Sequence, residues 1–98
     1  MIHVVAILTA QPGQRAAVLD AFRANMPAVL AEAGCIEYGP TVDAAGGTPF
    51  GPDTFVVIEK WASAEALAAH AKAPHMAAYG AAVKPMMANR VIHVLQEA

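Results

Sequence analysis

The amino-acid sequence predicts an α+β domain of the ferredoxin-like type, with an antiparallel sheet in the strand order 4-1-3-2 and both helical regions on one side. Two observations carry this prediction. The chain has 98 residues, which suits a single domain spanning residues 1–98. Its apolar residues also switch between the alternating spacing of strands and the three- and four-residue spacing of helices, in the order β-α-β-β-α-β.

The first half of the chain is expected to supply a strand, a helix and a second strand. Residues 2–10 are apolar and β-branched on both alternating faces, which is typical of a strand buried on both sides. Residues 14–33 show helical spacing, with Pro27 predicting a kink or restart and Gly34 predicting the stop. Residues 35–43 are interpreted as the second strand. The helical stripe is expected to be Val18, Phe22, Met26, Val29 and Leu30, and one strand face Ile36, Tyr38 and Val42.

The third strand follows a loop. Residues 44–53 are rich in Gly and Pro, which favours an irregular connection. Residues 54–61 alternate as a strand. Ser63 is a good N-cap for a helix over residues 64–72. One face of the strand is expected to hold Phe55, Val57, Glu59 and Trp61, and the other Val56 and Ile58.

A second helical piece and a last strand complete the pattern. Pro74 suits the first turn of a helix that runs to about Lys84. Residues 89–96 form the last strand, which is apolar on both faces. Two helical regions cover only one face of such a sheet, and soluble monomers avoid a large exposed apolar patch. We therefore expect a homodimer formed by sheet-on-sheet packing.

Composition and charge exclude several classes of protein. The net charge is −2 and there is no basic cluster, which excludes sequence-independent binding to nucleic acid. The longest bulky apolar run, Val4 to Leu8, is far shorter than the roughly 20 residues that span a membrane. The N-terminus lacks the cationic stretch of a secretory signal, and the single cysteine, Cys35, cannot form an internal disulfide. We expect a cytoplasmic protein with no membrane or nucleic-acid partner.

Two stretches of sequence carry a resemblance to a known family. Residues 32–38, EAGCIEY, resemble the pattern E-P-G-C-x-x-Y, with Ala33 in place of the proline. Residues 59–70, EKWASAEALAAH, resemble E-x-W-x-S-x-E-A-L-x-x-H, and a second histidine follows at His75. Together they resemble the antibiotic biosynthesis monooxygenase (ABM) domain, a family that includes quinol monooxygenases and forms dimeric α/β barrels. The resemblance extends over essentially the whole chain.

The resemblance implies both a site and a reaction. The site is a small cavity between the sheet and the helices. The reaction is that of a cofactor-independent monooxygenase, which oxidises a quinol-like or polyphenolic aromatic with dioxygen. Members of this branch are similar in using no metal, flavin or haem, because the deprotonated substrate itself reduces dioxygen. The protein then has to exclude water, orient the ring and accept a proton, and we expect no metal and no cofactor.

Three residues are candidates for catalysis. His70 lies near the edge of the inward helical stripe, and an ordinary histidine titrates near neutrality, which suits a general base. Glu59 shares the face of Val57 and Trp61; if it is buried it must be paired or neutral, which makes it a second candidate base. Tyr38 can donate to or accept from a substrate oxygen. A structural role for each residue stays open at this point.

Six further residues are candidates for substrate binding. The flat rings of Trp61 and Tyr79 suit an aromatic substrate. Asn25 borders an apolar stripe and could orient a substrate oxygen. His93 lies on a strand face that parity alone assigns neither to the cavity nor to the dimer. The remaining candidates, which could equally serve in capping or ordinary packing, are His75 and Met76.

Three other functions were weighed against this one. An isomerase that enolises a small hydroxyketone or sugar phosphate needs a base and a donor that polarises the carbonyl. A phosphate group would prefer cationic contacts, and Lys84 and Arg90 are the only basic residues near the last strand. A non-catalytic dimeric module that binds small molecules needs only the cavity. The haem-degrading branch relies on an asparagine, a tryptophan and a histidine where this chain aligns Ala6, His70 and Tyr79, so haem degradation is rejected.

Overall fold

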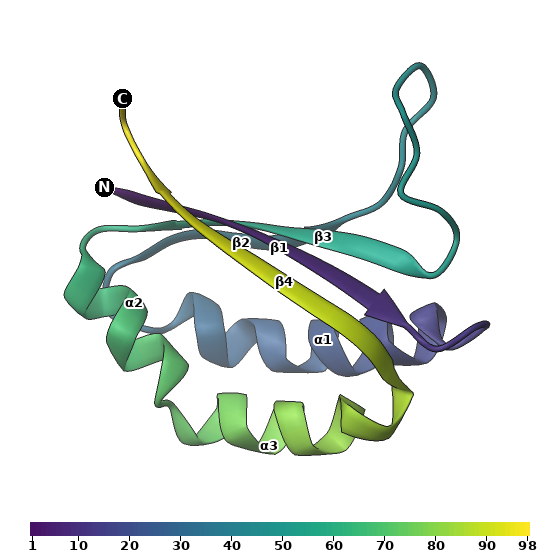
Figure 1. The fold of residues 1–98 in the computed structure, drawn as a ribbon. Helices are drawn as coiled ribbons and strands as arrows, with labels where there is room; N and C mark the ends of the chain where they lie inside the picture. Colours follow the sequence, from purple (N-terminus) through teal and green to yellow (C-terminus); the bar gives the residue numbers. More distant parts are fainter.

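The computed structural model describes residues 1–98 and has the predicted ferredoxin-like architecture, with the second helical region divided in two (Figure 1). The sheet order is β2-β3-β1-β4, which is the predicted order read from its other edge, and every pairing is antiparallel. The elements are β1 (Ile2–Ala10), α1 (Arg15–Leu30), β2 (Cys35–Thr41), β3 (Thr54–Trp61), α2 (Ala64–Ala71), α3 (Pro74–Val83), the short 3-10 turn η1 (Lys84–Met86) and β4 (Met87–Gln96).

All three α-helices lie on one side of the sheet, and the loop between β2 and β3 projects from the other side (Figure 1). Asp43 holds this loop, because its two carboxylate oxygens accept hydrogen bonds from the backbone N–H groups of Phe50 and Gly51, both at 2.9 Å. These hydrogen bonds hold the pKa of the Asp43 carboxyl below its ordinary value. None of the helices has the length and apolarity needed to cross a membrane.

The two faces of the sheet follow from the strand register. Val4, Ala6 and Leu8 of β1 are buried beneath the helices. Ile7 pairs with Val56 on one side and Val91 on the other, so these three side chains share the uncovered face. The apolar residues of that face are Val5, Ile7, Val56, Ile58, Val91 and Leu95. In a single chain, therefore, one sheet face is apolar and open.

The assignment of one face of the second strand is wrong. Tyr38 is buried, but Ile36 is 52% exposed and Val42 is 50% exposed. The pairing of β2 with β3 shifts register between Cys35 and Glu37, so alternation counted from Cys35 does not extend across this irregularity. The strand also ends at Thr41, before Val42.

Helix α1 ends three residues earlier than predicted. It runs through Pro27 without a restart and ends at Leu30, which is 50% exposed and lies outside the buried stripe. A turn then leads to Gly34, whose φ of 82° is accessible mainly to glycine. The prediction that Ser63 caps α2 is confirmed, since the Ala66 N–H donates to Ser63 Oγ at 3.1 Å.

Candidate active site

A cavity of about 1130 Å³ lies between the sheet and the α2–α3 layer. Eighteen of its 24 lining residues are hydrophobic, which suits an apolar ligand oriented by a few polar groups. β1 contributes Val4, Ala6 and Leu8, whereas Ile92 and Val94 come from the exposed strand β4. The polar and ionisable side chains at the wall are Tyr38, Glu59, His70, Tyr79, Lys84, Asn89 and Arg90.

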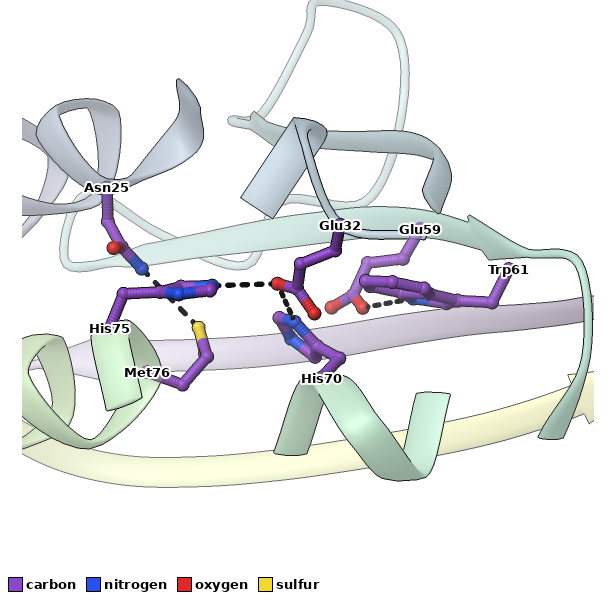
Figure 2. Close-up of polar contacts among 7 residues, drawn as sticks. All are labelled: Asn25, Glu32, Glu59, Trp61, His70, His75 and Met76. Carbon is purple, nitrogen blue, oxygen red and sulfur yellow. Dashed lines mark hydrogen bonds and ion pairs between the residues drawn. The ribbon is translucent and has the colours of Figure 1, made fainter. Parts of the chain in front are cut away.

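His70 reaches the cavity from the last turn of α2 and is tied to the chain on its other side. Its Nδ1 lies 2.9 Å from Oε2 of Glu32, and Nε2 of His75 lies 2.8 Å from the same oxygen (Figure 2). Glu32 stands in the turn after α1, so this carboxylate links three separate segments of the chain. The indole ring of Trp61 lies beside the imidazole of His70, with ring centroids 4.6 Å apart.

Glu59 is buried on β3 and accepts a hydrogen bond from the indole N–H of Trp61 at 2.9 Å (Figure 2). Burial raises the pKa of the Glu59 carboxyl above its ordinary value of 4.5, while the Trp61 hydrogen bond and the nearby His70 act in the opposite direction. The alternation of strand β3 puts both side chains on the same face, which is why a residue and its second neighbour can pair.

Two phenols stand at the cavity wall. Burial, and next the charge of Glu59, raise the pKa of Tyr38 well above its ordinary value, and burial raises the pKa of Tyr79 to about 12. Both hydroxyls therefore keep their hydrogen at neutral pH. The ring of Phe22 packs against both phenol rings. It stacks on the ring of Tyr38, with centroids 5.1 Å apart, and meets the ring of Tyr79 in an edge-to-face contact, with centroids 6.0 Å apart.

Several polar groups of this wall have no side-chain hydrogen bond, among them Lys84, Asn89, Arg90 and Oε2 of Glu59. Three further unpartnered atoms belong to a histidine and two tyrosines. They are Nε2 of His70 and the hydroxyls of Tyr38 and Tyr79, none of which takes part in a side-chain hydrogen bond. No fully buried side-chain nitrogen or oxygen in the structure lacks a hydrogen-bond partner. These three atoms must therefore reach accessible space, and the space that their residues line is the cavity.

The structure gathers some of the predicted site residues at the cavity and places others elsewhere. Tyr38, Glu59, His70, Met76 and Tyr79 line it. The other four predicted residues, which do not line it, are Asn25, Trp61, His75 and His93.

Each of these four has a defined place. Trp61 is fully buried behind Glu59 and His70, so it supports the wall without forming it. Asn25 Nδ2 donates to Sδ of Met76 at 3.4 Å. His75 binds Glu32, as described above. His93 pairs with Val5 and so lies on the sheet face opposite the cavity.

Sequence reasoning gave no role to Glu32, which holds both histidines. A signal was available, because Glu32 opens the EAGCIEY stretch that resembles the family pattern. That stretch was interpreted only as a mark of the family. Spacing could not supply the contact, since Glu32 and His70 are 38 positions apart in the sequence.

The cavity wall also carries two basic side chains. Lys84 and Arg90 both line the cavity, and Arg90 pairs with Leu8 toward one end of β1, whereas Glu59 pairs with Val4 toward the other end. No group of three or more His, Cys, Asp or Glu side chains has the arrangement of a metal site. A second hollow, of about 310 Å³, lies at the loop between β2 and β3, and its only ionisable residue is Asp43.

Comparisons with known proteins identify the family of this chain. The family described as "Antibiotic biosynthesis monooxygenase" matches residues 1–82. The Escherichia coli K12 protein named "Probable quinol monooxygenase YgiN" is 46% identical over 101 residues, which cover 98% of this chain and 97% of that protein.

Two solved structures share the fold and retain moderate sequence identity. PA3566 from Pseudomonas aeruginosa is 27% identical with a TM-score of 0.85, over 99% of this chain and 93% of its own. Rv0793 from Mycobacterium tuberculosis is 26% identical with a TM-score of 0.83, over 99% and 94% of the two chains. The match over most of the chain and the close relative lead to one conclusion: this protein belongs to the antibiotic biosynthesis monooxygenase family.

Proposed function

We propose that this protein is a monooxygenase that oxidises a quinol-like or polyphenolic aromatic with dioxygen and needs no metal or organic cofactor. The observation that carries the proposal is the placement of a histidine nitrogen and two tyrosine hydroxyls, those of His70, Tyr38 and Tyr79, without protein partners at the wall of a mainly apolar cavity. The name of the Escherichia coli relative supports the quinol class. Family membership supports the oxygenase class.

In the proposed reaction, His70 is the base. Nε2 takes the proton of a phenolic hydroxyl, and the electron-rich phenolate that results reduces dioxygen. One oxygen atom enters the ring as a new carbonyl or hydroxyl group, and the other leaves as water with the two hydrogens lost by the substrate. The neutral hydroxyls of Tyr38 and Tyr79 hold the substrate oxygens by hydrogen bonds. Apolar walls exclude water from the reacting ring.

Two features of the surroundings belong to the same proposal. The open apolar face of the sheet is covered by a second copy of the chain, since soluble monomers avoid a patch of this kind. The cytoplasm is the proposed compartment, because the single free cysteine, Cys35, needs no oxidising environment. Burial raises the pKa of the Cys35 thiol, which keeps it in the unreactive protonated form.

The test measures quinone formation from a panel of hydroquinones under air and under nitrogen. We expect oxygen-dependent turnover by the wild type, a loss on the order of 10²-fold in kcat for His70→Gln, and a roughly 3- to 10-fold loss in kcat/KM for Tyr38→Phe. Glu65→Gln is the control, because Glu65 is exposed on the same helix as His70 and does not line the cavity.

Two outcomes contradict the proposal. Oxygen-independent isomerisation of a small hydroxyketone or sugar phosphate, with no turnover of any hydroquinone, indicates an isomerase, for which Lys84 and Arg90 could hold a phosphate. Tight stoichiometric binding of the whole panel without any turnover indicates a module that only binds small molecules. The comparisons favour neither of these alternatives.

A further inference from the structure

We propose that Glu32 is a positioning residue, which holds His70 in the tautomer that carries its hydrogen on Nδ1 and so leaves Nε2 free to accept a proton at the cavity. The proposed function supplies the reaction that this base serves. The tautomer itself is a property of the free protein, so it can be measured whether or not a quinol is the substrate.

The geometry of the Glu32–His70 contact requires this tautomer. Oε2 of Glu32 lies 2.9 Å from Nδ1 of His70, and the side chains of the two residues are only 13% and 8% exposed. An ionised carboxylate has no hydrogen to donate, so the ring nitrogen that faces it must carry one. A neutral imidazole has a single N–H, and with this hydrogen on Nδ1 the other nitrogen is an acceptor.

The contact of His75 with the same Glu32 oxygen predicts the opposite tautomer for that ring. Its Nε2 lies 2.8 Å from Oε2 of Glu32 and must also carry a hydrogen, whereas its side chain is 28% exposed and lies outside the cavity wall. One carboxylate oxygen can accept both hydrogen bonds. The two histidines are therefore opposite tautomers when neutral, Nδ1–H for His70 and Nε2–H for His75.

The same contact acts during proton transfer. When Nε2 of His70 takes the substrate proton, the ring becomes a cation that keeps its Nδ1–H on the negatively charged Glu32. The indole of Trp61, with its centroid 4.6 Å from the imidazole, adds a favourable cation–π contact. The proton then leaves Nε2 for the oxygen atom that departs as water, which returns His70 to its starting tautomer.

The turn that carries Glu32 is packed against the start of α2. Gly34, two residues later, has its carbonyl oxygen 2.8 Å from the N–H of Ala62, which ties the turn to the start of α2. A Cβ atom at Gly34 would lie 2.6 Å from Cβ of Ala66, so the turn and α2 approach as closely as a glycine allows. Glu32 and His70 are thus carried by two segments that are packed directly against each other.

The first test is spectroscopic and uses no substrate. Long-range ¹H–¹⁵N spectra of the labelled protein at about pH 8.5, where an ordinary histidine is neutral, distinguish the two tautomers. His→Gln variants at positions 70 and 75 assign the signals. We expect Nδ1–H for His70 and Nε2–H for His75. In Glu32→Met, which keeps the side-chain length but has no strong acceptor, the His70 signal should move to the tautomer mixture of a free imidazole. An Nε2–H tautomer for wild-type His70 overturns the proposal.

The second test is kinetic. It distinguishes the effect of the negative charge of Glu32 from the effect of its hydrogen-bond acceptor oxygen. With a quinol that the wild type oxidises, Glu32→Met should lower kcat on the order of 10²-fold with KM changed by less than about twofold. Glu32→Gln keeps an acceptor oxygen without the charge and should lose less. Glu65→Gln, an exposed control, should leave both tautomers and kcat unchanged. A folded Glu32→Met with wild-type kcat contradicts the proposal, and where no quinol is oxidised at all, the spectra alone decide it.

Discussion

At the scale of single residues, Glu59 has a carboxyl group whose burial disfavours the ionised form. Glu59 is only 6% exposed, and burial raises the pKa of its carboxyl above 4.5 even though the Trp61 indole N–H donates to it. A raised pKa in the folded state means that the folded protein binds the proton more tightly than the unfolded chain. The stabilising contribution of Glu59 is thus complete below pH 4.5 and declines as the pH rises through the folded-state value.

Glu59→Gln should therefore raise the melting temperature at about pH 7.5 by roughly a few degrees, and this gain should shrink toward pH 4. The amide keeps an oxygen that can accept from Trp61 but has no charge to desolvate. Thermal unfolding followed by circular dichroism across this pH range measures the effect. The control Glu65→Gln removes a charge that favours the start of α2, so it should cost up to about 1 kcal/mol instead. A Glu59→Gln protein that is less stable than the wild type at neutral pH would falsify this account.

At the residue scale, the sequence predicted which face of β3 each side chain occupies, but not how deeply each side chain is packed. Alternation along β3 correctly put Glu59 and Trp61 on the inner face, but it could not tell that Trp61 stands behind Glu59 and away from the cavity. The face on which His93 lies follows from the pairing of β4 with β1, which alternation along a single strand does not give. Glu32 needed a contact between distant segments of the chain. Each of these placements depends on contacts between segments that are distant in the sequence, and residue spacing does not predict such contacts.

At the scale of elements, the turn between α1 and β2 packs against α2, and this packing brings Glu32 close to His70. Helix α1 ends at Leu30, and the chain turns through Gly34 into β2. The sequence predicted the stop at Gly34, because glycine commonly follows a helix end in the left-handed region. It did not predict the closeness of α2, which depends on the small side chains of Ala62 and Ala66 opposite Gly34.

Gly34→Ala should destabilise the protein more than Gly13→Ala does. Both glycines have a positive φ, 82° and 78°, so each substitution carries the same backbone cost of about 1 kcal/mol or more. Only at Gly34 does the new Cβ meet another atom, at 2.6 Å from Ala66 Cβ, which should add roughly 1 to 3 kcal/mol. Urea unfolding of the two variants isolates the difference. Equal losses of stability would show that α2 has room to move away from the turn.

At the scale of the whole molecule, the sheet has one side covered by the helices and one side that is apolar and open. The α-helices all lie on one side of the sheet (Figure 1). The cavity lies on that side, and the six apolar residues of the open face lie on β1, β3 and β4. The strand order and the helical layer could be predicted from the sequence, because hydrophobic periodicity and right-handed crossovers leave few alternatives. The same periodicity showed both faces of three strands to be apolar, which is why a second copy was expected before the fold was known.

A single charge in the centre of the open face should prevent the proposed dimer from forming. Ile7 pairs with Val56 and Val91, so Ile7→Lys puts an ammonium group in the middle of the apolar surface, and two-fold symmetry puts a second one opposite it. Each uncompensated buried charge costs about 3 to 5 kcal/mol, so association should weaken by at least about 10³-fold. Light scattering at micromolar concentration should then give a mass near 10.1 kDa for the variant and about twice that for the wild type. Leu30→Lys is the control, because Leu30 is an exposed apolar residue of the helical layer and its substitution should leave the dimer intact. A wild-type mass of 10.1 kDa, or a dimeric Ile7→Lys protein, would mean that the open face is not the surface that joins two copies.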